Sequence, residues 1–191
     1  PFFMEQGWFV RVAIPRALGY AAGGPADSGA PVRRVPTSHA ARRTLHYHQP
    51  IGLHPELATL AAARVQRACG LDTARFGVLL IGHGSARAPG RPMALHRHAD
   101  ALAATGMFAA ARAAFLEEEP WVAAALREWR ALPVAVVGFF AGDGGHVRDD
   151  LPALLQAEQV QRGEAGPPLR YLGVIGDDPA MPRIILDQVA G

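Results

Sequence analysis

Two histidines and one glutamate each follow an apolar segment in the second half of the chain. His83 stands in "IGHGS" after the apolar run 77–82, and Glu117 stands in "FLEEE" at the end of segment 108–119. His146 stands in "GDGGH", just after the apolar and β-branched segment 133–142. Two imidazoles and one carboxylate suit a divalent transition metal, with positions left open for a substrate. The residue types predict a metal site, provided that the fold brings the three segments together.

The segments around these residues alternate between two patterns. Strands are predicted at 77–85, 108–119, 133–142 and 169–176, and helices at 93–106, 120–129, 145–160 and 178–190. Pro120 at the start of one helix fits the first turn, where proline is tolerated. This alternation predicts an α/β fold, a parallel four-stranded sheet with helices on both faces. The carboxyl ends of parallel strands meet at one edge, where ligands bind, so the three candidate ligands are expected there.

The first part of the chain repeats the end of this pattern. The segment "FFMEQGWFVRVAIP" (2–15) matches "FFAGDGGHVRDDLP" (139–152) at an offset of 137, with Phe9 in the place of His146. The segment "HYHQPIGLHP" (46–55) resembles "LRYLGVIGDDP" (169–179) at an offset of 124, so His46 and His48 are expected on a strand. The Gly, Pro and Ser-rich stretch 19–38 accounts for the longer connection in the first copy. We expect the remainder of a degenerate unit at 1–74, followed by a complete unit at 75–191.

Other interpretations of these residues stay open. The "HGS" sequence also occurs in oxyanion loops of hydrolases, but the chain has no "GxSxG" nucleophile motif. A phosphate loop is disfavoured because neither "GK[ST]" nor "GxGxxG" is present. Glu118 and Glu119 are expected to be solvated charges, and His96 and His98 are expected at the surface.

Composition limits the possible function classes. Half of the residues are apolar, 19% are charged and the net charge is +2, which is typical of a soluble globular chain and does not favour nucleic-acid binding. No apolar run approaches the roughly 20 residues of a membrane span. The single Cys69 excludes an internal disulfide and fits a reducing, cytoplasmic location. The chain begins without Met inside an apparent strand, so we expect a fragment of a two-repeat protein.

Three segments resemble one protein family. The sequences "LLIGHGSARAP" (79–89), "AFLEEEPWVAAAL" (114–126) and "FFAGDGGHVRDDLPALL" (139–155) are similar to CbiX-type sirohydrochlorin cobaltochelatases, within the class II chelatases. The resemblance covers 77–191 and extends more loosely through 1–70. It implies that His83, His146 and Glu117 are the metal-binding and catalytic residues. It also implies insertion of Co²⁺, as substrate metal, into sirohydrochlorin in cobalamin biosynthesis, while relatives insert Fe²⁺ to form sirohaem and Ni²⁺ stays possible.

The resemblance also implies a substrate and a partner. The substrate is an acidic tetrapyrrole, which arginines in the loops could hold through guanidinium–carboxylate pairs. Family members are either paired single repeats or fused double repeats, so the cleft is expected to need the missing part of the first repeat or a second protomer. A non-catalytic metal-binding domain of a larger protein is the alternative from another class. The residues expected to contact the substrate are Gly84, Ser85, Arg87, Gly145 and Phe9, with Arg91 and Arg148 as further candidates.

Overall fold

The computed structural model describes residues 4, 7–18, 33–35, 43–45, 47–70, 72–84, 94–142 and 144–190. For 33–35, 43–45 and His146 only the backbone is described. The chain forms two compact units. Unit 1 comprises Pro1–His54 together with Pro182–Gly191, and unit 2 comprises Pro55–Met181.

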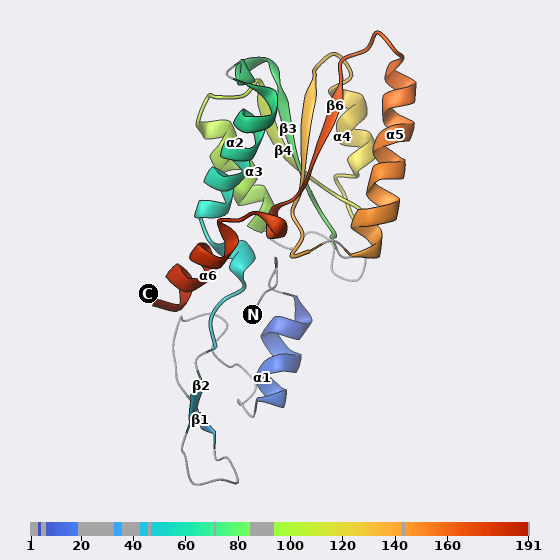
Figure 1. Ribbon diagram of the computed structural model, residues 1–191. Helices are drawn as coiled ribbons and strands as arrows, with labels where there is room; N and C mark the ends of the chain where they lie inside the picture. Colours follow the sequence, from blue (N-terminus) through green and yellow to red (C-terminus); the bar gives the residue numbers. More distant parts are fainter. Residues whose placement is uncertain are drawn as a thin grey trace. The chain divides into compact units, whose positions relative to one another are not determined.

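Unit 2 is built on a parallel four-stranded sheet (Figure 1). Its strands are β3 (Gly77–Gly82), β4 (Ala110–Phe115), β5 (Val134–Gly138) and β6 (Leu169–Val174), in the spatial order β4-β3-β5-β6. Every residue of β3 and β5 is buried, as expected for central parallel strands covered on both faces. The predicted α/β architecture is confirmed, although β4 ends at Phe115, four residues before the end of the predicted segment.

Helices cover both faces of this sheet. Helices α2 (Glu56–Cys69) and α3 (Ala94–Ala104) pack together on one face, and α4 (Val122–Glu128) and α5 (Leu151–Arg162) pack on the other (Figure 1). Alternate residues of β3 point to opposite faces of the sheet. Leu79 and Ile81 are on the face that packs against α4 and α5. The core on that face consists of Leu79, Ile81, Ala114, Val122, Ala125, Leu126, Trp129, Val134, Val136, Leu151 and Leu155.

Two helices of unit 2 lie close to the predicted prolines, but only α5 includes its proline. Helix α5 has Pro152 as its second residue. It follows the π-helical turn η5 (His146–Asp150) without a break. Helix α4 begins at Val122, two residues after Pro120, so it is shorter than the predicted 120–129. None of the described helices has the length and hydropathy that a membrane crossing requires.

Unit 1 contains short elements. They are the π-helical turn η1 (Phe9–Ala13), α1 (Ile14–Ala17), the antiparallel pair β1 (Arg33–Val35) and β2 (Arg43–Leu45), the 3-10 turn η3 (Ile51–Leu53), and α6 (Met181–Ala190) from Pro182 onward. The predicted strand around His46 and His48 is wrong for the described residues 47–50, which pair with no strand. This segment is held differently, because the Tyr47 hydroxyl donates a 2.8 Å hydrogen bond to the Val10 carbonyl. Burial raises the pKa of Tyr47.

Candidate active site

The adjacent strands β3 and β4 carry His83 and Glu117 to the same edge of the sheet. Both residues follow their strands directly, and the ladder of backbone hydrogen bonds continues past the strand ends. The Leu116 N–H donates to the Gly82 carbonyl at 3.1 Å, and the Glu117 N–H donates to the His83 carbonyl at 2.9 Å. These two bonds fix the backbones from which both side chains extend, as the position of parallel strand ends predicts.

The side chains of His83 and Glu117 approach each other at this edge. The His83 Nδ1 atom lies 3.6 Å from Glu117 Oε2, and each side chain is 46% exposed. Two ligands that each lie about 2.1 Å from a tetrahedral metal are roughly 3.4 Å apart, so this separation suits joint coordination of one cation. At this separation the two side chains do not share a direct hydrogen bond, so a proton passing between the imidazole and the carboxylate would need one bridging water molecule. Their exposure leaves both groups accessible to a substrate from solvent.

Gly84 has a backbone conformation and a close environment that favour glycine. Its φ of +79° lies in the left-handed region that glycine adopts without a steric penalty. A Cβ atom there would lie 2.9 Å from Glu118 Cγ and 3.0 Å from Phe115 Cβ. Glu118 is therefore packed over the glycine and buried, at 6% exposure. The prediction that Glu118 is a solvated charge is wrong, because the missing side chain of Gly84 leaves the space that Glu118 fills.

The loop after β5 begins beside the same strands. The Phe139 N–H donates to the Ile81 carbonyl of β3 at 2.6 Å, and the Phe140 carbonyl accepts from Gly176 N–H at 3.0 Å. At the far end of the loop, the Gly144 carbonyl accepts from the N–H groups of Val147 and Arg148 and starts η5. The His146 side chain lies outside the described part of the structure, so its place beside His83 remains a prediction. Among the described side chains, no group of three His, Cys, Asp or Glu residues could hold a metal.

Comparison with known proteins identifies the family. Residues 77–191, more than half of the chain, match the CbiX family. The chain belongs to this family. The match begins at β3 and ends one residue after α6, so it includes His83, Glu117 and the loop that leads to His146.

Three known proteins are similar to this CbiX-family chain over its entire length. A probable sirohydrochlorin cobaltochelatase from Halobacterium salinarum is 26% identical over all of this chain and 70% of its own length. The structure of CbiX, the terminal enzyme for biosynthesis of siroheme in denitrifying bacteria, is 30% identical with a TM-score of 0.70, over all of this chain and 73% of that one. A multi-domain protein from Deinococcus radiodurans with structural similarity to chelatases is 28% identical, with a TM-score of 0.78 over all of this chain. This chain spans only 40% of that protein's length.

The remaining predicted contacts of the CbiX-family chain fall in different places. Ser85, Arg87 and Arg91 lie outside the described residues. Gly145 is exposed at the start of η5. Phe9 is exposed at the start of η1 in unit 1, with its ring 5.3 Å from that of Trp8 in an edge-to-face arrangement. The expected contacts of Gly145 and Phe9 with a substrate remain predictions.

Helix α3 of the CbiX-family chain places its two histidines differently. His96 is exposed, with its ring 5.3 Å from that of Phe115, as predicted for a surface residue. His98 is 5% exposed, and its ring lies 5.0 Å from that of Phe139, so the prediction of a surface position is wrong. His98 shares the spacing of Leu95 and Leu102, the i, i+3, i+7 pattern of a buried helix face. That spacing was the signal in the sequence for its burial.

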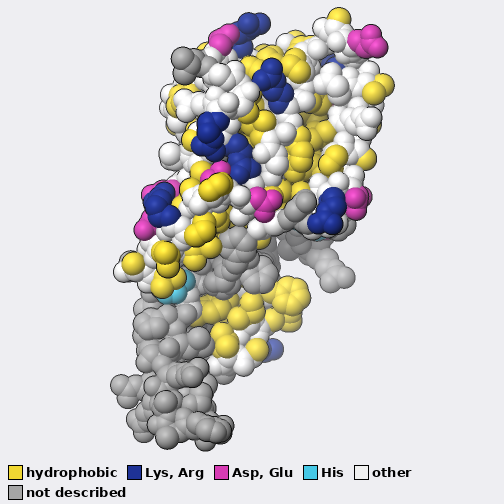
Figure 2. All heavy atoms as spheres, in the orientation of Figure 1, with side chains coloured by type: hydrophobic (Ala, Val, Ile, Leu, Met, Phe, Trp, Pro, Cys, Tyr) yellow, Lys and Arg dark blue, Asp and Glu magenta, His cyan; other side chains and the backbone are white. Residues whose placement is uncertain are grey.

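Charged side chains are interspersed on the face of the molecule drawn in Figure 2. Arginines and acidic residues alternate there with apolar side chains over the described residues. Such an arrangement suits short-range pairing more than a long-range field. Arg148, exposed on η5 next to His146, is the described arginine nearest in sequence to the predicted ligands.

Proposed function

We propose that this CbiX-family chain inserts a divalent metal, Co²⁺ in the first place, into sirohydrochlorin. The observation that carries the proposal is the approach of His83 Nδ1 to Glu117 Oε2 at 3.6 Å. Adjacent parallel strands hold both groups at the carboxyl edge of the sheet, where ligands of such folds bind. Similarity to a probable sirohydrochlorin cobaltochelatase along the entire chain supports the substrate assignment.

The reaction exchanges two pyrrole N–H protons of the macrocycle for one metal ion. Neutral imidazole and carboxylate bind the incoming cation, and the same groups accept the protons that leave. We propose that His83 and Glu117 do both, with His146 as the second imidazole. Because a protonated imidazole binds no metal, insertion is expected to slow as the solution becomes acidic.

The choice of metal is the open part of the proposal. The relative from Halobacterium salinarum is named a probable cobaltochelatase. The CbiX of known structure is instead described as the terminal enzyme of siroheme biosynthesis in denitrifying bacteria. Imidazole and carboxylate ligands accept Fe²⁺, Co²⁺ and Ni²⁺ alike. Sirohaem formation with Fe²⁺ is therefore the second candidate, and one assay ranks the three metals.

The test measures absorbance changes of sirohydrochlorin with Co²⁺, Fe²⁺ or Ni²⁺, each with and without the purified protein. The expected result is an insertion rate above the uncatalysed rate, highest with Co²⁺. His83→Ala, His146→Ala and Glu117→Gln are each expected to lower the rate at least about 100-fold, the usual contribution of a positioned acid–base group. Because the side chains of His83 and Glu117 are half-exposed, each substitution should change the free energy of unfolding by no more than about 0.5 kcal/mol.

Two exposed neighbours serve as matched controls. His96→Ala removes an imidazole from α3, and Glu119→Gln removes a carboxylate two residues after Glu117. Both variants are expected to keep the insertion rate. Full activity of His83→Ala would contradict the proposed site. Metal binding without any insertion would instead favour a non-catalytic chelatase-like domain, which the similarity to the multi-domain Deinococcus radiodurans protein brings into consideration.

A further inference from the structure

Two short turns occur twice in the structure, at the sequence distances of the internal repeat. The π-helical turn η1, Phe9–Ala13, has its counterpart 137 positions later in η5, His146–Asp150. The 3-10 turn η3, Ile51–Leu53, has its counterpart 124 positions later in η6, Ile175–Asp177. Both pairs follow the order of the repeat, so the resemblance extends from sequence to local structure.

The two 3-10 turns also make the same close backbone contact. A Cβ atom on Gly52 would overlap the carbonyl of Met4, and a Cβ atom on Gly176 would overlap the carbonyl of Ala141. Gly52 and Gly176 are 124 positions apart, while Met4 and Ala141 are 137 positions apart, so counterparts touch counterparts. Each contact lies within one unit. This shared contact supports one duplicated structural element in each unit.

The helix that follows each 3-10 turn, however, belongs to the other unit. Helix α2 follows η3 of unit 1 along the chain but is part of unit 2. Helix α6, from Pro182 onward, follows η6 of unit 2 but is part of unit 1. The chain passes between the units at His54–Pro55 and at Met181–Pro182. We infer that the two repeats exchange their final helices, so that each repeat supplies the last helix of the unit built around the other.

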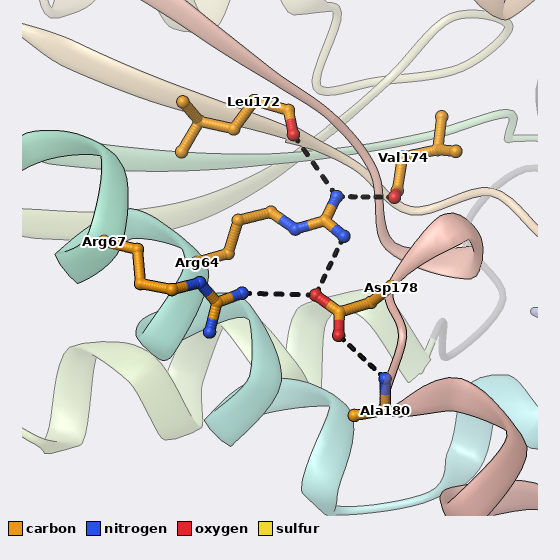
Figure 3. A network of polar contacts seen from close by, with 6 residues as sticks. All are labelled: Arg64, Arg67, Leu172, Val174, Asp178 and Ala180. Carbon is orange, nitrogen blue, oxygen red and sulfur yellow. Dashed lines mark hydrogen bonds and ion pairs between the residues drawn. The ribbon is translucent and has the colours of Figure 1, made fainter.

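Corresponding positions on the two exchanged helices make the docking contacts. On α2, the Arg64 guanidinium donates hydrogen bonds to the carbonyls of Leu172 and Val174 in β6 of unit 2 (Figure 3). On α6, the Gln188 side-chain amide donates a hydrogen bond to the Gln49 carbonyl of unit 1. Arg64 and Gln188 are 124 positions apart, and the counterpart of Gln49 lies between Leu172 and Val174. Each helix thus holds the corresponding backbone segment of the other repeat.

Two ion pairs also hold helix α2 in unit 2. Asp178, 5% exposed, accepts from Arg64 at 2.9 Å and from Arg67 at 3.3 Å, and its other oxygen accepts from the Ala180 N–H (Figure 3). Its counterpart in unit 1 is His54, which offers no carboxylate. Charge-assisted hydrogen bonds are about twice as strong as neutral ones. The exchange is therefore expected to be held more firmly in unit 2, through Arg64.

Apolar burial supports the same assignment of α2. Its residues Leu57, Leu60, Ala61 and Val65 are buried, and the helix contacts β5, β6 and α3 of unit 2. These residues follow the i, i+3, i+4, i+8 spacing of one helix face. Removing α2 would expose this face and the sheet beneath it. The complete unit 2 thus needs a helix that the sequence assigns to the preceding repeat.

The exchange of helices predicts how the protein behaves when its backbone is cleaved between the two repeats. The connection from Gly70 to Asp72 joins α2 to the second repeat, and both of these residues are exposed. If helices are exchanged, a break there leaves α2 in unit 2 and α6 in unit 1. The two fragments would then hold each other although the chain is no longer continuous. If each repeat kept its own helix, they would part at this break.

The test cuts the 191-residue chain at this connection. A protease recognition sequence is inserted beside Asp72, the protein is purified intact and then cleaved under native conditions. The expected result is co-elution of both fragments at the elution volume of the intact chain, at micromolar concentration. Fragments that elute separately and remain folded would overturn the exchange.

Variants of Arg64 test whether the two fragments associate through the contact of α2 with β6 or through non-specific attraction. Arg64→Ala in the cleaved chain is expected to weaken fragment association at least tenfold, because α2 loses its bonds to β6 and to Asp178. Arg64→Gln, which introduces the residue type found at position 188, is expected to weaken it less. Arg97→Ala, an exposed arginine on α3, is the matched control and should leave association unchanged. Equal association of Arg64→Ala and the control would overturn the proposed docking.

Cys69 supplies a second readout in the uncut chain. It is the single cysteine and lies at the end of α2, where Arg170 of β6 donates a 3.0 Å hydrogen bond to the neighbouring Ala68 carbonyl. Burial raises the pKa of the Cys69 thiol. Arg64→Ala is expected to increase the alkylation rate of Cys69 at least tenfold, and Arg97→Ala to leave it unchanged. An unchanged rate in Arg64→Ala would count against α2 docking; neither measurement needs substrate, so the inference is independent of the proposed function.

Discussion

Replacing Gly84 by alanine tests whether the glycine next to His83 is required. The added methyl group meets two obstacles. A non-glycine residue in the left-handed region costs about 1–2 kcal/mol, and φ at Gly84 is +79°. The new Cβ would also lie 2.9 Å from Glu118 Cγ and 3.0 Å from Phe115 Cβ, well inside an ordinary carbon contact of about 3.5–4.0 Å. Such overpacking costs about 1–3 kcal/mol, so Gly84→Ala should lose about 2–5 kcal/mol in total.

Gly106→Ala separates the two contributions. Gly106, just after α3, has φ of +66°, but a Cβ atom there would meet nothing within 4 Å. This control should lose only the backbone contribution of about 1–2 kcal/mol. Urea denaturation of both variants gives the difference, expected to be about 1–3 kcal/mol larger for Gly84→Ala. Equal losses would refute the argument that the close packing of Glu118 and Phe115 leaves no room for a side chain at position 84.

The same pair of variants also tests whether the packing at Gly84 matters for metal insertion. The methyl group must push the loop away from β4, and a shift of about 1 Å in a reacting group can lower a rate roughly 100-fold. Metal insertion by Gly84→Ala should therefore fall about 100-fold, measured where the variant is still folded. Gly106→Ala should keep the insertion rate. Full insertion by a folded Gly84→Ala variant would show that the position of His83 does not depend on the glycine.

Two further predictions concern stability. Burial by itself would raise the pKa of Asp178, but the hydrogen bonds and charges around it outweigh this effect and lower the pKa. Its stabilisation is thus present above the unfolded-state pKa of about 3.9 and is lost as the pH falls through the lower folded value. Asp178→Asn leaves the Arg64 side chain, which is 13% exposed, without its carboxylate and should lose about 2 kcal/mol at pH 7, the usual contribution of a hydrogen bond to a charged group. This difference shrinks below about pH 4; a difference independent of pH would refute it. Leu151→Ala, fully buried in the core, should lose about 2–5 kcal/mol in urea denaturation, while Val160→Ala on the same helix, 74% exposed, should change by less than about 0.5 kcal/mol; similar losses would contradict the assigned packing.

The sheet and the strand-end pair could be predicted from sequence because both depend on short-range patterns. The run "GVLLIG" has the apolar character of a buried parallel strand, and β3 forms over those six residues. His83 and Glu117 follow neighbouring strands, and the topology of parallel sheets alone places them at one edge. The distance between their side chains came only from the structure, because the number of residues between two positions does not give their separation in space.

Glu118 and His98 were misplaced for a different reason. Charge and polarity favour exposure, but Gly84 opens a space that Glu118 fills, and Phe139 offers a ring against which His98 packs. Both partners are distant in sequence, so local composition could not reveal them. The strand predicted around His48 failed similarly, since a strand requires a hydrogen-bonding neighbour that local propensity cannot supply.

The amino-acid sequence by itself determined the order of strands and helices, the family, and the loops that bear the candidate ligands, because these follow from local periodicity and short motifs. Tertiary structure alone decided which unit each final helix completes. Helix α2 has the same local pattern in either unit, and its place is set by long-range contacts of its apolar face and of Arg64, whose partner Asp178 lies 114 residues further along the chain. Contacts over such distances depend on the whole packed arrangement, which no segment of the sequence specifies separately.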